Sequence, residues 1–90
     1  MPKAVVDPAE LRQFASNLKT FNERMRDQTV RLNGQFQHLG ETWRDQEHKK
    51  FAEVFQQTMH TLTQFMKVSQ DHIPFLTRKA EAAEEYLRRR

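Results

Sequence analysis

The sequence is poor in cysteine, glycine and proline. It contains no cysteine, two glycines and three prolines among 90 residues. The absence of cysteine excludes a disulfide scaffold and any chemistry that needs a thiolate. Two glycines are too few to build a phosphate-binding loop, a dinucleotide-binding fingerprint or a nucleophile elbow. The glycine-poor, charge-rich composition favours long helices over sheets.

The sequence also lacks a long apolar run. No apolar stretch reaches ten residues, which excludes a membrane-spanning helix and disfavours a cleaved signal peptide. We therefore expect the protein to be cytoplasmic before any export, and any export to proceed without such a signal. The net charge is +3, and the terminal arginines at positions 88, 89 and 90 match that excess. A balance this close to neutral does not by itself indicate a nucleic-acid partner.

The sequence does contain a strong signal for a long first helix. Asp7 followed by Pro8 is typical of a helix start, because aspartate accepts hydrogen bonds from the first free amides and proline lacks the N–H that would stay unpaired. Apolar residues then recur at intervals of three and four, with glutamines in two slots: Leu11, Phe14, Leu18, Phe21, Met25, Leu32 and Leu39. This heptad pattern predicts a helix over residues 8–39.

A short turn is predicted over residues 40–45. Gly40 stands where a left-handed cap of the first helix is expected. The second helix starts either at Thr42, because "TWRD" fits the capping pattern [ST]-x-x-[DE], or at Asp45, which leaves Trp43 in the loop. So short a connection between two long helices predicts an antiparallel hairpin.

A second helix is predicted over residues 43–72, followed by a helical segment over residues 75–90. Pro74 separates them and predicts a kink or a break, because proline removes one N–H and clashes with the preceding turn. One row of this helix carries Phe51, Phe55, Leu62, Phe65 and Leu76, and a neighbouring strip carries Met59, Met66, Ile73, Ala80 and Leu87. The apolar face is therefore wider than one helix pair needs.

The width of this face predicts association, because a lone hairpin would leave more apolar surface in water than monomers usually tolerate. We predict an all-α protein, an antiparallel helical hairpin that dimerises into a four-helix bundle with an identical or a similar hairpin. A monomeric three-helix bundle, in which the segment after Pro74 folds back, is the alternative. We assign to the core Leu18, Phe21, Met25, Phe55, Leu62 and Phe65, and to the partner side Met59, Met66 and Ile73; Phe51 belongs to the same core-or-interface set.

No catalytic, metal or cofactor site is predicted. No two histidines have the i,i+4 spacing of ligands on one helix face. Acidic side chains alternate with lysine and arginine in the pattern of a solvated helix face. We therefore expect no enzyme activity, no cofactor, no metal and no small-molecule substrate.

A small dimeric RNA-binding hairpin, similar to Rop-like proteins, is the main alternative function, and a cytoplasmic adaptor is another. RNA-binding hairpins use basic and aromatic residues gathered on one face of the bundle. The basic residues here are spread along the chain and interleaved with acids, whereas phosphate binding favours concentrated positive charge. This pattern disfavours a nucleic-acid partner.

The chain resembles the WxG family of type VII secretion proteins, the Esx-like type. The resemblance rests on the length, the two long amphipathic helices and Trp43 at the central turn, with Leu39 upstream and Phe51 and Phe55 downstream. It implies a non-catalytic protein, secreted or acting as partner or adaptor in such a system, that pairs with a similar hairpin and meets the secretion machinery.

Two positions depart from the family pattern. Asp45 replaces the glycine of W-x-G, and Arg90 stands where an acid would complete a Y-x-x-x-[DE] tail after Tyr86. The turn is therefore expected to be built from Gly40 and a threonine or aspartate cap. Trp43 is expected either to cover the end of the hairpin core or to act as a recognition anchor for the export machinery.

Overall fold

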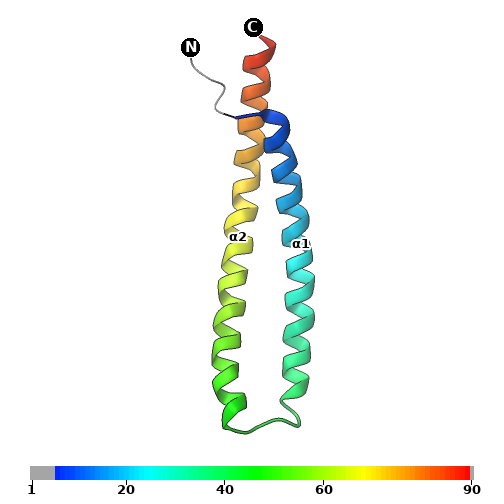
Figure 1. The fold of residues 1–90 in the computed structure, drawn as a ribbon, viewed down its shortest axis with the longest axis vertical. Helices are drawn as coiled ribbons and strands as arrows, with labels where there is room; N and C mark the ends of the chain where they lie inside the picture. The colour runs from blue at the N-terminus through cyan, green and yellow to red at the C-terminus, as the bar shows by residue number, and fades with distance from the viewer. Residues whose placement is uncertain (1–5, 90) are drawn as a thin grey trace.

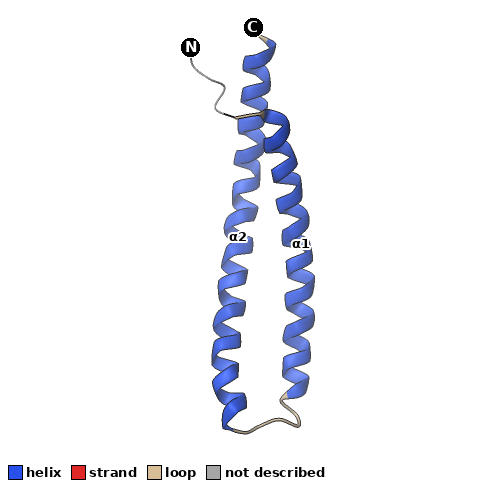
Figure 2. Cartoon of the chain, viewed as in Figure 1, coloured by secondary structure: helices blue, strands red, loops and turns tan. Residues whose placement is uncertain are grey.

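The computed structural model describes residues 6–89 and shows two helices joined by a short turn (Figures 1 and 2). Helix α1 runs Pro8–Leu39 and helix α2 runs Gln46–Arg88. They lie side by side and antiparallel (Figure 1), which confirms the predicted all-α hairpin. The molecule measures 67 × 21 × 15 Å. Since one helix with its side chains is about 10–12 Å across, neither broad face of this thin hairpin is covered.

Each helix begins at an aspartate cap. The Asp7 carboxylate accepts hydrogen bonds from the N–H groups of Ala9 at 2.9 Å and Glu10 at 3.4 Å. The Asp45 carboxylate accepts one from the N–H of His48 at 3.0 Å. Of the two predicted starts of the second helix, the structure therefore has the aspartate, which satisfies an amide that a helix N-terminus would otherwise leave unpaired.

The turn differs from the predicted left-handed cap. Gly40 has φ −62° and ψ −15°, a right-handed conformation, and its N–H is within bonding distance of the carbonyls of Phe36 and Gln37. The following residues tighten the helix end, with the N–H of Thr42 bonded to the carbonyl of Leu39 at 3.1 Å. Glycine is useful here for its size, because a Cβ at Gly40 would lie 3.2 Å from the Gln37 carbonyl oxygen and 3.6 Å from Nε2 of His48.

Helix α2 continues through Pro74, so the predicted break is not found. Pro74 lies on the exposed side of the helix, where the carbonyl that loses its N–H partner can bond to water instead. The chain does not fold back after this residue, and residues 6–89 contain no third helix. The three-helix alternative is therefore wrong for the described chain.

The core is a single row of contacts between the helices, here called the seam. Buried or half-buried residues recur at intervals of three and four on both helices. On α1 the seam contains Leu11, Ala15, Leu18, Asn22, Met25, Thr29 and Phe36; on α2 it contains His48, Ala52, Phe55, Met59, Leu62, Met66, Ser69, Ile73 and Ala80.

The seam corrects part of the predicted division between core and partner side. Met66, expected to face a partner, is buried with 8% exposure, and Met59 and Ile73 lie half-buried in the same row. Phe21 and Phe65, expected in the core, are 50% and 47% exposed. The reason is steric, because small residues and flexible methionine side chains fit between two closely packed helices, whereas phenylalanine rings fit better on the flank.

Candidate interaction surface

Four phenylalanine rings lie on one broad face of the hairpin. Each stands one residue before a seam residue: Phe14, Phe21, Phe51 and Phe65. One residue turns an α-helix by about 100°, so these rings share one offset from the seam. In an antiparallel pair, related by a twofold axis normal to its plane, the same offset on both helices points to the same face. The edge-to-face contact of Phe21 with Phe65, at 6.4 Å between ring centroids and 85° between planes, agrees with this placement.

Further apolar side chains extend this face along both helices. We define the aromatic face as Phe14, Phe21, Leu32, Leu39, Phe51, Val54, Phe65, Val68 and Phe75. Their exposed fractions lie between 44% and 61%. Single exposed apolar residues are common on proteins, but a continuous row of this kind usually marks a binding surface.

The opposite face is polar. It carries the residues that follow a seam residue by one position, among them Arg12, Arg26, Thr63, Gln70 and Glu84. Arg12 pairs with Glu84 across the helices through two hydrogen bonds, from Nε at 2.8 Å and from Nη2 at 2.9 Å. The hydrogen bonds to the charged forms raise the pKa of Arg12 and lower the pKa of Glu84. The hairpin is therefore bifacial, with one side suited to water and the other to a partner.

Aromatic rings also fill the seam next to the turn. His48 stacks on Phe36 at 5.1 Å with 9° between the ring planes, and Phe36 lies 4.5 Å from Phe55. Trp43 is half-buried and packs edge-on against His48 at 4.9 Å and 80°. The tryptophan therefore covers the end of the seam. This geometry supports a structural role for Trp43 and leaves its role as a recognition anchor a proposal.

The sequence patterns missed the contributions of Phe36 and His48 to this cluster. Phe36 falls outside the heptad row that begins at Leu11, so it does not stand out as a seam residue. The available signal is the spacing of the second helix, where His48, Ala52 and Phe55 follow at intervals of four and three. With Asp45 taken as the cap, this row points into the hairpin from its first turn.

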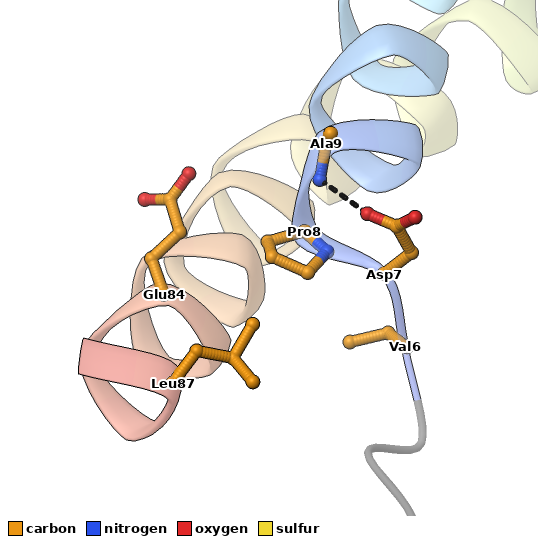
Figure 3. A pocket seen from close by; sticks show the side chains of 6 residues that line it. All are labelled: Val6, Asp7, Pro8, Ala9, Glu84 and Leu87. Carbon is orange, nitrogen blue, oxygen red and sulfur yellow. Dashed lines mark hydrogen bonds between the residues drawn. The ribbon is translucent and has the colours of Figure 1, made fainter. Parts of the chain in front are cut away.

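At the other end of the hairpin, a shallow groove is lined by the start of α1 and the last turns of α2 (Figure 3). The Asp7 carboxylate is directed at the N–H of Ala9, while Glu84 and Leu87 lie on the other side of Pro8. The only carboxylate of α2 in the lining, Glu84, is engaged by Arg12. No set of polar groups converges here to hold a small molecule, so the groove adds no second site.

Other kinds of site have little support in the described residues. Within residues 6–89, no group of three or more His, Asp or Glu side chains is placed to hold a metal ion. Neither α1 nor α2 has an apolar segment of the length and hydropathy that crossing a bilayer requires. Basic side chains lie on both faces, with Arg12 and Arg26 on the polar one and Arg24 and Arg31 beside the aromatic one. That distribution does not form the concentrated patch that phosphate binding favours.

Comparison with known families gives one match. The family model described as "Proteins of 100 residues with WXG" (WXG100) matches residues 5–86. Comparison with curated proteins and with solved structures gives no match. The matched segment includes both helices nearly in full and the turn that carries Trp43.

Proposed function

Because the chain belongs to the WXG100 family, we propose that it acts in type VII secretion as a non-catalytic helical hairpin that pairs with a second hairpin. The observation that carries this proposal is the aromatic face, which the fold builds and leaves uncovered. Two hairpins stacked through such faces form a four-helix bundle, in which the seam of each becomes one layer of a shared core.

The size of the aromatic face is suitable for a stable interface. The hairpin is 67 Å long and 21 Å wide, whereas a standard protein interface needs about 800 Å² from each partner. The half-exposed rings of Phe14, Phe21, Phe51 and Phe65 would lose their remaining contact with water. Apolar burial of this kind stabilises a complex by about 25 cal/mol per Å² before the costs of association are subtracted.

The pairing is tested by sedimentation equilibrium on the wild-type chain and on Phe21→Asp. The aspartate places a charge in the middle of the aromatic face, so we expect it to abolish association. The matched control is Val30→Asp, because Val30 is 68% exposed and lies off the aromatic face. The control should associate as the wild type does. A wild-type chain that stays monomeric at about 1 mM, alone and with every other hairpin tested, would contradict the pairing.

We further propose that the hairpin is cytoplasmic until export and leaves the cell together with its partner. Two departures bear on this step. Asp45 replaces the glycine of the family motif yet caps α2, so the turn forms without that glycine. Arg90, which replaces the acid of the tail motif, lies outside the described residues. In this proposal the partner supplies the missing tail signal, and Trp43 is available at the turn as a contact for the secretion machinery.

Export is tested by expressing the tagged chain in a bacterium with an intact type VII system and in the same strain without the system's ATPase. We expect the chain in the medium only when both the ATPase and a partner hairpin are present. Phe21→Asp should stop export, and Val30→Asp should not. Equal amounts in the medium of the two strains would contradict a secretion role. Retention under all conditions would favour a cytoplasmic adaptor.

A further inference from the structure

We propose that the partner of the aromatic face is a different hairpin, with acidic residues opposite Arg24 and Arg31, and not a second copy of this chain. This inference rests on the pairing proposed above and concerns its selectivity. It follows from the charges along the two edges of the aromatic face, which differ between α1 and α2.

The edge on α1 is basic. Arg24 follows Phe21 by three residues, which places it about 60° further round the helix, towards the outer edge of the face. Arg31 comes seven residues later and shares this edge. Both side chains are exposed, and none of the ion pairs within residues 6–89 includes either of them. The nearest acid between them in sequence, Asp27, lies about 40° further round and faces away from the aromatic face.

The edge on α2 is apolar. The residues that follow Phe51, Phe65 and His72 by three positions are Val54, Val68 and Phe75. These three side chains are 61%, 59% and 59% exposed. The same rotational position is therefore charged on one helix and apolar on the other. A partner has to satisfy two free guanidinium groups along one edge and cover an apolar strip along the other.

A second copy stacked with α1 on α1 does not satisfy the basic edge. Arg24 lies near the middle of Pro8–Leu39, so an antiparallel twofold through the centre of the bundle brings the two Arg24 side chains together. Like charges opposed at an interface are unfavourable. The acid on the same edge, Glu10, is fourteen residues from Arg24, or about 21 Å along the helix. That separation exceeds the screening length of about 8 Å at physiological salt.

Stacking a second copy with α1 on α2 is unsuitable for another reason. It places the basic edge of one copy against the apolar edge of the other, where Val54, Val68 and Phe75 offer no acceptor. A guanidinium that is desolvated without a carboxylate destabilises an interface. A hairpin with an apolar strip and glutamate or aspartate opposite Arg24 and Arg31 avoids both problems, because arginine and carboxylate form paired, charge-assisted hydrogen bonds.

The test uses a charge-reversed copy, R24E/R31E, as the acid-edged hairpin. It keeps the aromatic face and the apolar edge of α2 and changes only the basic edge. We expect the wild type to bind R24E/R31E at least about tenfold more tightly than either protein binds itself. The difference should shrink as sodium chloride rises from about 50 to about 500 mM, since salt screens both the attraction and the repulsion. Fluorescence anisotropy with one labelled chain measures all three affinities.

The matched control is K19E/R26E, which makes the same change in net charge on the same helix. Lys19 and Arg26 follow seam residues by one position and therefore lie on the polar face. The wild type should bind this control no more tightly than it binds itself. Circular dichroism of each variant shows whether the helices are intact.

The possible outcomes separate this inference from the pairing proposal. If the wild type binds itself as tightly as it binds R24E/R31E, and Phe21→Asp abolishes both, the aromatic face pairs but charge does not select the partner, which overturns the inference. If K19E/R26E gains affinity equally, net charge alone is responsible, and the inference is again overturned. If no mixture associates at about 1 mM in either salt, the pairing proposal fails, and the inference fails with it.

Discussion

The two ends of the hairpin hold their helices together with side chains of different size. Near the turn the seam is filled by rings, with Phe36 between His48 and Phe55. Near the chain ends it contains small residues, of which Ala15 and Ala80 are 5% and 0% exposed. The ribbons lie further apart towards the turn than towards the chain ends (Figure 1). Since the distance between packed helices depends on the side chains at the contact, residue size accounts for this taper.

A polar contact separates the two regions. Asn22, 2% exposed, donates from Nδ2 to the hydroxyl of Ser69 at 2.7 Å, and that hydroxyl donates to the carbonyl of Met66 at 3.1 Å. Buried polar pairs of this kind contribute little net stability but disfavour other alignments, because any shift leaves both groups unpaired. The ring region and the alanine region therefore meet at a point where the register of the helices is set.

The largest effect is expected from removing a ring near the turn. Phe55→Ala deletes a 7% exposed side chain that contacts Phe36 and Phe51. Truncation of a buried phenylalanine costs about 3–5 kcal/mol. Urea unfolding, followed by circular dichroism at a fixed protein concentration, measures the loss. Val30→Ala, in an exposed position, should change the free energy of unfolding by no more than about 0.5 kcal/mol. Equal losses in the two variants would refute a ring-filled core at this end.

At the alanine end, enlarging a residue should destabilise the hairpin. Ala80→Leu adds a branched side chain where the helices are closest and exposure is 0%. Overpacking of this kind costs about 1–3 kcal/mol. The control is Ala82→Leu, two residues away on the same helix and exposed. A stable Ala80→Leu protein would mean that the helices can separate there at little cost. The taper would then not depend on alanine.

A smaller effect is expected at the boundary between the regions. Ser69→Ala removes the partner of the buried Asn22 amide, with an expected cost of about 1 kcal/mol. Adding Asn22→Leu should restore this loss or more, because replacing both members of a buried polar pair by apolar groups is often neutral or stabilising. If the double variant is stable, duplicated amide signals in its NMR spectrum would reveal a lost register. A single set of signals would show that other contacts align the helices.

The smallest effect is expected from the ion pair on the polar face. The hydrogen bonds from Arg12 lower the pKa of Glu84, so the ionised form is favoured in the folded protein. Stability from this pair is therefore present at neutral pH and is lost as the pH falls through that lowered value. We expect Glu84→Gln to lower the Tm slightly at pH 7, with the difference closing on acidification below about pH 4.

The control for the ion pair is Glu85→Gln. Glu85 bonds only to Arg88 and Arg89 of its own helix, so this change should leave the contact between the helices intact. A difference in Tm for Glu84→Gln that persisted at low pH would show that the carboxylate acts through packing instead of charge.

Local chemistry is enough to predict the helices and their reversal. An aspartate before a proline starts α1, an aspartate cap starts α2, and the apolar spacing between them is helical. The effect of Pro74 is less predictable, because a proline on the solvent side of a helix needs no substitute for the lost hydrogen bond other than water. Trp43 marks the turn in the sequence, but its contact with His48 depends on where the chain re-enters a helix.

The choice of seam depends on both helices at once. Each helix carries adjacent apolar rows, and periodicity gives each row a similar claim to the core. Packing decides between them, since Ala15, Met66 and Ala80 allow close approach whereas Phe21 and Phe65 do not. The phenylalanines are therefore displaced to one face and remain uncovered there. The sequence alone predicts a hairpin with surplus apolar surface, and tertiary packing determines which face carries it, because side-chain fit between two helices is not a property of either helix by itself.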